Sequence, residues 1–192
     1  RARRREALAL VLLGFERRTS ALLHLTRGLD DARALDRTSA APAEPAAPSE
    51  LTRRLEAALT EAELGTATAE ATLGELSTAE ARLGTTLERL ARSDASPMLL
   101  VRTLEARAWV RMARGAHAEA TTDARDALAR ARDALGDGHP VTLGVLYALG
   151  TAEALGGAST SGLPKLEEAA RRRSGPRKAE VLLTLSRALA AD

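Results

Sequence analysis

The sequence contains no cysteine, isoleucine, asparagine or glutamine, and aromatic residues make up only 2% of its 192 residues. Without cysteine the chain can form neither a disulfide nor a thiolate metal site. Valine occurs only six times, so the apolar β-branched and aromatic side chains that pack on pleated sheets are scarce. Alanine (42) and leucine (33) dominate instead, and both are strong helix formers. The composition therefore predicts an all-α fold and excludes sheet architectures.

The sequence also has no large excess of positive or negative charge. The chain has 28 Lys and Arg against 26 Asp and Glu, a net charge of +2, which gives no broad field for attracting polyanions. Arginine supplies 26 of the 28 cations, and with the missing Ile and Asn this is typical of high-GC bacterial coding. No apolar run approaches the roughly 18 residues of a membrane helix, so no transmembrane segment is predicted.

The chain divides into a long helix, a linker and a region with regular breaks. Residues 1–37 carry apolar side chains at helical spacing, which predicts one long amphipathic helix. Residues 38–49 hold three prolines among small residues and are predicted to be a linker, after which Ser49 is a plausible N-cap. The stripe of the first helix comprises Leu8, Leu12, Phe15, Leu22, Leu25, Leu29, Ala32 and Leu35. The chain begins with Arg1, so we expect a piece of a longer protein.

Glycines and prolines recur regularly from residue 50 to residue 192. Gly74, Gly115 and Gly157 lie 41 and 42 residues apart, and Pro97, Pro140 and Pro176 follow them. Glycine suits the end of a helix and proline the first turn of the next, so the unit is a helix pair of about 42 residues. Such a period is typical of an α-solenoid. The expected helices are approximately 50–73, 75–93, 97–114, 116–135, 140–155, 163–173 and 177–191.

The helix expected over residues 116–135 has one apolar face and one charged face. Its inner stripe is mostly alanine, which lets neighbouring helices approach closely. The opposite face is predicted to be solvated, and it carries Glu119, Asp123, Asp126, Arg130 and Asp133.

Small residues at fixed places relative to the turn glycines carry a family resemblance. Ala79 and Ala120 each follow a turn glycine by five residues, and Ala108 and Gly150 lie in the preceding helices. The Leu-Gly and His-Pro pairs that close the segment 127–140 complete the pattern. Residues 51–192 thus resemble a tetratricopeptide-repeat (TPR) array of the longer kinesin-light-chain type, although Gly162 replaces the crossing alanine in the last unit. The resemblance implies a short right-handed α-solenoid of antiparallel helix pairs.

The N-terminal helix carries a second resemblance. The segment Leu13-Gly14-Phe15-Glu16-Arg17-Arg18, followed by spaced leucines, is similar to the helix that precedes the repeat array in myxobacterial serine/threonine protein kinases. This resemblance implies a sensor or docking region of a larger signalling protein, without its kinase domain. The compartment stays open: cytoplasmic, or extracytoplasmic if a membrane span precedes the segment in the parent protein.

Nothing in the sequence predicts an enzyme. His24, His117 and His139 lie on separate elements, and no zinc spacing, phosphate-binding loop or kinase signature is present. Neither a metal nor a cofactor is expected. The basic clusters at Arg1–Arg5 and Arg171–Arg173 favour a juxtamembrane segment and a helix C-terminus, respectively, over nucleic-acid binding.

In TPR-like arrays the first helix of each repeat lines the concave groove where partners bind. The candidate groove residues are Arg102, Glu105, Trp109, Met112, Tyr147 and Arg187. Trp, Tyr, Met and Arg dominate binding energetics at interfaces. The alternative is that Trp109 and Tyr147 fill gaps between repeats.

The predicted function is therefore a non-catalytic module that binds a protein or peptide partner in its groove. The alternative is a structural element that self-associates into a homo-oligomer through its N-terminal helix, because a solenoid needs its ends covered. Nucleic-acid binding and a helical enzyme are disfavoured.

Overall fold

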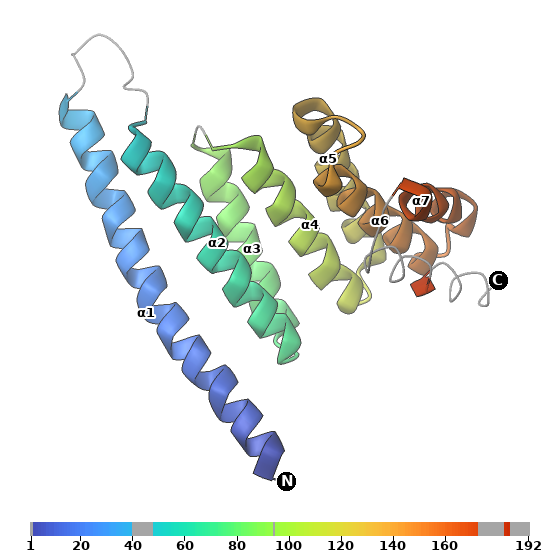
Figure 1. Cartoon of the computed structure of the whole chain (residues 1–192), viewed down its shortest axis with the longest axis horizontal. Coiled ribbons are helices and arrows are strands. Elements are labelled where there is room, and N and C mark those ends of the chain that lie inside the picture. The colour runs from blue at the N-terminus through green and yellow to red at the C-terminus, as the bar shows by residue number, and fades with distance from the viewer. Residues whose placement is uncertain (1, 40–47, 94, 173–182, 185–192) are drawn as a thin grey trace. The chain divides into compact units, whose positions relative to one another are not determined.

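The computed structural model describes residues 2–39, 48–93, 95–172 and 183–184, with side chains of the first helix described from Ser20. Within these residues all regular secondary structure is helical, which confirms the all-α prediction. Seven helices are described, and within each of the two units below consecutive helices pack on one another, which is consistent with a helical repeat protein (Figure 1). They form two compact units, residues 1–95 and 96–192.

The first unit contains α1 (Ala2–Ser39), α2 (Glu50–Thr72) and α3 (Leu76–Ala91). Helix α2 packs against both α1 and α3. Leu29 and Ala32 of α1 are buried, and Leu55 of α2 lies against Gly28. At 1.5 Å per residue, the 38 residues of α1 span about 57 Å and the 23 residues of α2 about 35 Å, so α1 is much longer than the helix it packs on.

The start of α2 is fixed by side chains on both sides of the predicted linker. Ser49 is its N-cap and accepts a hydrogen bond from the backbone N–H of Thr52 at 3.2 Å. Asp36 of α1 accepts from the Ser49 backbone N–H at 3.0 Å and from the Thr52 hydroxyl at 2.7 Å. These bonds lower the pKa of Asp36. The expected linker, residues 38–49, lies mostly outside the described residues.

The second unit contains α4 (Pro97–Ala113), α5 (His117–Leu135), α6 (Pro140–Leu155) and α7 (Ser159–Arg172). Two helix hairpins, α4–α5 and α6–α7, pack together through α4 against α6 and α5 against α6. Helix α6 is therefore enclosed, and every residue from Thr142 to Glu153 is buried. Pro97 and Pro140 occupy first-turn positions, as predicted, and His139 caps α6 by accepting from the Val141 N–H at 3.2 Å.

The turns of the α2–α3, α4–α5 and α6–α7 hairpins have the same backbone geometry. Gly74, Gly115 and Gly157 have φ values of 86°, 79° and 82°, a left-handed conformation that side chains with a Cβ rarely adopt. In each turn the residue after the glycine donates its N–H to the carbonyl five residues before it, at 2.9, 2.9 and 2.8 Å, which is the Schellman closure of a helix. The sequence prediction that these glycines end helices is confirmed.

In the last hairpin the second helix begins earlier than expected. Its second helix was expected over residues 163–173, but α7 begins at Ser159. The Gly162 N–H bonds to the Ala158 carbonyl at 3.0 Å, so helical bonding starts directly after the turn and Pro164 falls inside the helix. The expected helix 177–191 lies outside the described residues, apart from two helical residues, 183 and 184.

In the same hairpin α6 and α7 cross too closely for a Cβ at Gly162. A Cβ on Gly162 would lie 2.7 Å from the Gly150 carbonyl oxygen and 2.8 Å from the Ala154 nitrogen. These are backbone atoms, which cannot move aside as a flexible side chain does. Glycine at 162 is therefore required by the packing of α7 on α6, where the other two hairpins tolerate Ala79 and Ala120, both fully buried.

We predict that Gly162→Ala lowers the free energy of unfolding by about 1–3 kcal/mol, because the added methyl overpacks the crossing. Gly65→Ala is the matched control. Gly65 lies inside α2, and a Cβ there would have no neighbouring atom within 4 Å, so alanine should raise stability by about 0.5–1 kcal/mol through helix propensity. Urea unfolding followed by circular dichroism measures both changes. Equal effects of the two variants would contradict the close crossing.

Candidate functional site

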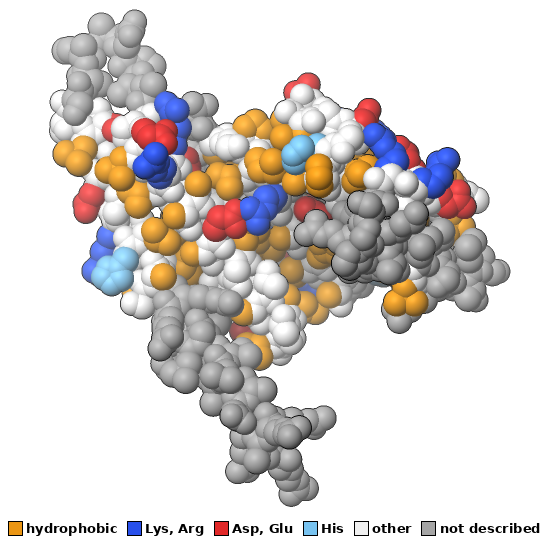
Figure 2. Space-filling model, viewed as in Figure 1, with side chains coloured by type: hydrophobic (Ala, Val, Ile, Leu, Met, Phe, Trp, Pro, Cys, Tyr) orange, Lys and Arg blue, Asp and Glu red, His pale blue; other side chains and the backbone are white. Residues whose placement is uncertain are grey.

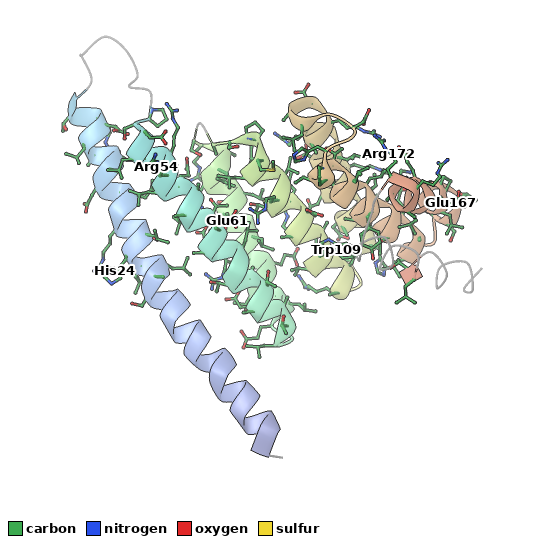
Figure 3. All side chains as sticks on the ribbon, in the orientation of Figure 1. His24, Arg54, Glu61, Trp109, Glu167 and Arg172 are labelled. Atoms are coloured by element: carbon green, nitrogen blue, oxygen red, sulfur yellow. The ribbon has the colours of Figure 1, made fainter. Side chains whose placement is uncertain are left out.

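Trp109 of α4 and Tyr147 of α6 form the aromatic contact between the two hairpins of the second unit. Their ring centroids lie 5.4 Å apart and the ring planes are tilted by 50°, within the range of favourable aromatic pairs. Figure 3 labels Trp109 on the C-terminal half of α4. The structure thus brings together two candidate groove residues that are 38 positions apart in the sequence.

The two rings differ in exposure. Tyr147 is only 7% exposed, and its hydroxyl lies 2.7 Å from the Thr184 hydroxyl, in hydrogen-bonding contact. Trp109 is half-buried, so part of its ring reaches the surface. Tyr147 therefore supports the tryptophan from the interior, and Trp109 is the ring that a partner could contact.

The other candidate groove residues have different environments. Arg102 is exposed, Glu105 is half-buried, and Met112 is 7% exposed, so the methionine belongs to the core of its unit. Arg187 lies outside the described residues. The accessible part of the candidate site is thus the α4 surface formed by Arg102, Glu105 and Trp109, which we call the α4 face.

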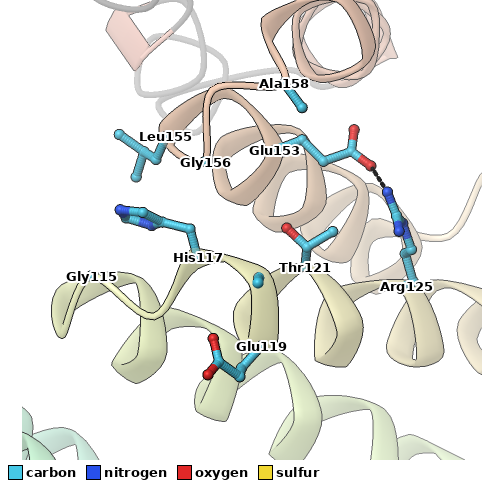
Figure 4. A pocket seen from close by; sticks show the side chains of 10 residues that line it. Gly115, His117, Glu119, Thr121, Arg125, Glu153, Leu155, Gly156 and Ala158 are labelled. Carbon is cyan, nitrogen blue, oxygen red and sulfur yellow. Dashed lines mark hydrogen bonds and ion pairs between the residues drawn. The ribbon is translucent and has the colours of Figure 1, made fainter.

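A separate cleft lies at the turn end of the second unit, between the start of α5 and the end of α6 (Figure 4). Its volume is about 490 Å³. The α4–α5 turn and α5 contribute one wall, and the end of α6 with the following turn contributes the other. The polar lining residues are His117, Glu119, Thr121, Arg125 and Glu153.

Glu153 is the electrostatic centre of this cleft. Its side chain is 2% exposed and accepts hydrogen bonds from three donors: Arg125 Nη2 at 2.8 Å, Lys165 Nζ at 2.7 Å and Ser161 Oγ at 2.9 Å. Burial raises the pKa of Glu153, but the three hydrogen bonds lower it by more, so it lies below its ordinary value of 4.5. One carboxylate thereby joins α5, α6 and α7.

Three side chains that can exchange protons line the cleft: His117, Glu119 and Glu153. Glu153 is committed to its three donors, and Glu119 points away from the Arg125–Glu153 pair (Figure 4). His117 Nδ1 is buried and has no hydrogen-bond partner. Within the described residues no group of three or more His, Cys, Asp or Glu side chains is arranged to hold a metal ion.

Three of the four carboxylates that are buried among the described residues lie near turn glycines, and sequence reasoning missed them. Asp123 was expected on a solvated face, but its side chain is 5% exposed and bonded to Arg107 at 2.7 and 2.8 Å and to Arg111 at 2.9 Å. That expectation is wrong because Asp123 faces α4 beside the alanine stripe. Glu70 and Glu153 are buried in the same way. All three lie at a fixed distance before or after a turn glycine, which was the available signal.

The surface carries mixed charge. On the face that Figure 2 shows, basic and acidic side chains lie interspersed with small hydrophobic patches. Among the residues described, no helix combines the length and apolar character that a membrane crossing requires.

Comparison with known proteins gives no family assignment: no protein-family model matches the chain, and no curated protein matches it.

We predict that Glu153 makes part of the stability of the second unit acid-sensitive. Because its pKa is lowered in the folded state, its contribution is complete above pH 4.5 and is lost as the pH falls through the lower, folded-state pKa. Glu153→Gln should therefore be destabilised near neutral pH and should lose less stability on acidification than the wild type. Glu168→Gln, which alters a surface pair with Arg172, is the control. Parallel stability curves for the wild type and Glu153→Gln, measured by urea unfolding from neutral pH to below 4.5, would contradict this role.

Proposed function

We propose that this chain is a non-catalytic TPR-like interaction module that binds a peptide or helix of a protein partner on its α4 face. The observation that carries the proposal is the half-buried Trp109, held on the buried Tyr147 of the next hairpin at 5.4 Å. A tryptophan with a fixed ring loses little conformational freedom on binding, which is why such residues anchor interfaces.

The surroundings of Trp109 support a protein partner. Arg102 is exposed on the same helix, seven residues away, so it lies about two helical turns along the same face. An arginine on the same face as a tryptophan adds a charged, planar group to a surface with an apolar anchor. The succession of α4–α5 and α6–α7 hairpins supplies the rigid scaffold on which repeat proteins present such residues.

The parent protein that best suits this module is a bacterial signalling protein such as a serine/threonine kinase. The similarity of residues 13–18 to the helix that precedes the repeats in myxobacterial kinases supports this context. In it, the module would dock a regulator or substrate while another domain supplies the chemistry.

We predict that Trp109→Ala combined with Arg102→Ala weakens binding of selected peptides by a factor of about 30 or more, corresponding to about 2 kcal/mol for an interface anchor. The peptides are selected from a random library on the wild-type chain and measured by titration calorimetry. Arg130→Ala, which removes an exposed arginine from α5, is the control and should leave binding unchanged. Circular dichroism verifies that helicity is retained.

Two results would contradict the α4 face. One is that the selected peptides bind the double variant as tightly as the wild type. The other is that selection on the wild type enriches no peptide while selection on an unrelated peptide-binding control succeeds.

A second candidate function, self-association through α1, is favoured by the length of that helix. Helix α1 exceeds α2 by 15 residues, 38 against 23, and the apolar stripe predicted from the sequence continues into this excess through Leu8 and Leu12. Such a stripe, on a helix longer than the one it packs against, would offer a surface to a second copy.

We predict under this alternative that the chain is a dimer by light scattering and that Leu8→Glu with Leu12→Glu makes it a monomer. The double substitution places two charges in the apolar stripe, where a helix–helix contact would have to desolvate them. Wild-type chain that is monomeric across the concentration range of the experiment would remove self-association.

A further inference from the structure

Each of the three helix hairpins is held by an ion pair at the same place relative to its turn glycine. In every case the residue four positions before the glycine pairs with the residue eight positions after it. The three pairs are Glu70–Arg82 around Gly74, Arg111–Asp123 around Gly115, and Glu153–Lys165 around Gly157. The Arg82 Nε to Glu70 Oε2 distance is 3.0 Å, Arg111 Nη1 to Asp123 Oδ2 is 2.9 Å, and Lys165 Nζ to Glu153 Oε2 is 2.7 Å.

In all three pairs the carboxylate is buried and the cation reaches the surface. The side chains of Glu70, Asp123 and Glu153 are 0%, 5% and 2% exposed, whereas those of their cations are 29%, 19% and 29% exposed. A buried carboxylate is tolerated only when it is paired and hydrogen-bonded. Each hairpin therefore needs a cation at this place on the opposite helix.

The polarity of the pair is reversed in the middle hairpin. The carboxylate is on the first helix in the outer two hairpins, at Glu70 and Glu153, but on the second helix in the middle one, at Asp123. If helices of hairpins adjacent in sequence exchanged partners, like charges would meet. Glu70 and Glu153 would each face Asp123, and Arg111 would face Arg82 or Lys165.

Two other features shared by the hairpins do not distinguish right from wrong partners. The α2–α3 and α4–α5 turns share the same glycine conformation and the same Schellman bond of 2.9 Å. Both hairpins carry buried alanines seven residues before and five after that glycine: Ala67 and Ala79, and Ala108 and Ala120. A helix pair built from α2 and α5 would satisfy both features.

We propose that the alternating polarity of these buried ion pairs selects the correct helix partner and prevents exchange of helices between adjacent hairpins, both within one chain and between two copies. Coiled coils use charged positions in the same way, by making the wrong pairing repulsive. The repulsion would act on refolding, when helices of repeated sequence compete for the same partner. An exchange between two copies yields a domain-swapped dimer.

The test reverses the polarity of the ion pair in the first hairpin by combining Glu70→Arg with Arg82→Glu. The double variant keeps an attractive pair within α2–α3 but gives it the polarity of α4–α5, so wrong pairings of these two hairpins become attractive as well. After unfolding in denaturant and dilution, we expect a several-fold larger dimer fraction than for the wild type, measured by size-exclusion chromatography with light scattering. The exposed pair Asp126–Arg130, reversed in the same way, is the matched control and should give the wild-type fraction.

Two further measurements make the outcome decisive. The single variants Glu70→Arg and Arg82→Glu should each unfold at lower temperature than the double variant, because each leaves two like charges in one hairpin.

Since the chain has no cysteine, a single cysteine introduced at the exposed Thr72 allows donor- and acceptor-labelled copies to be refolded together. Energy transfer above that of the wild type then identifies exchange between copies.

The proposal is overturned if the double variant refolds to the wild-type dimer fraction and energy transfer. It is also overturned if the double variant is no more stable than the single variants, or does not refold. The proposal requires that the reversed ion pair stabilises the α2–α3 hairpin as the original pair does.

Discussion

The close approach of alanine-rich helices is the constraint on which the rest of this structure depends. Alanine buries little apolar area, so a core that contains as many alanines as leucines gains less from the hydrophobic effect per residue than one of large side chains alone. It compensates by letting helices cross at short distance, as the fully buried Ala79, Ala108 and Ala120 do. At such distances long polar side chains that flank the crossing meet across the seam between the helices.

The buried ion pairs follow from that geometry. Once α2 and α3 lie close together, Glu70 has no access to water, and its charge is tolerated because Arg82 reaches it from the opposite helix. The same seam holds Glu63 against Arg89, with Thr60 and Thr86 bonded to this pair. Arg89 Nε, which is buried, has no hydrogen-bond partner, so this part of the first unit is polar without being fully satisfied. Polar seams of this kind add specificity of pairing more readily than stability.

The candidate site depends on the same helix packing indirectly, through Tyr147. Because α6 is enclosed, Tyr147 is fixed by its surroundings and by Thr184, and it in turn limits the positions open to Trp109. A binding anchor on a rigid support differs from one on a mobile loop, since little entropy is lost when a partner orders it. The scaffold and the proposed site are therefore parts of one arrangement in the second unit.

The helices and their turns are determined by residues close together in the chain, so they could be predicted from the sequence. The scarcity of apolar β-branched and aromatic residues determined the all-α class. A left-handed glycine or a first-turn proline acts within a few residues of its own position, as at Gly115 and Pro140. Side-chain environments depended on contacts between helices and were decided by the tertiary structure. Helical periodicity placed Asp123 on an outer face, but α4 covers it. Repeat alignment left Tyr147 open between a groove position and a packing position, and in the structure its side chain lies on the enclosed helix α6. A sequence specifies which residues share a face of a helix; only packing decides what that face meets.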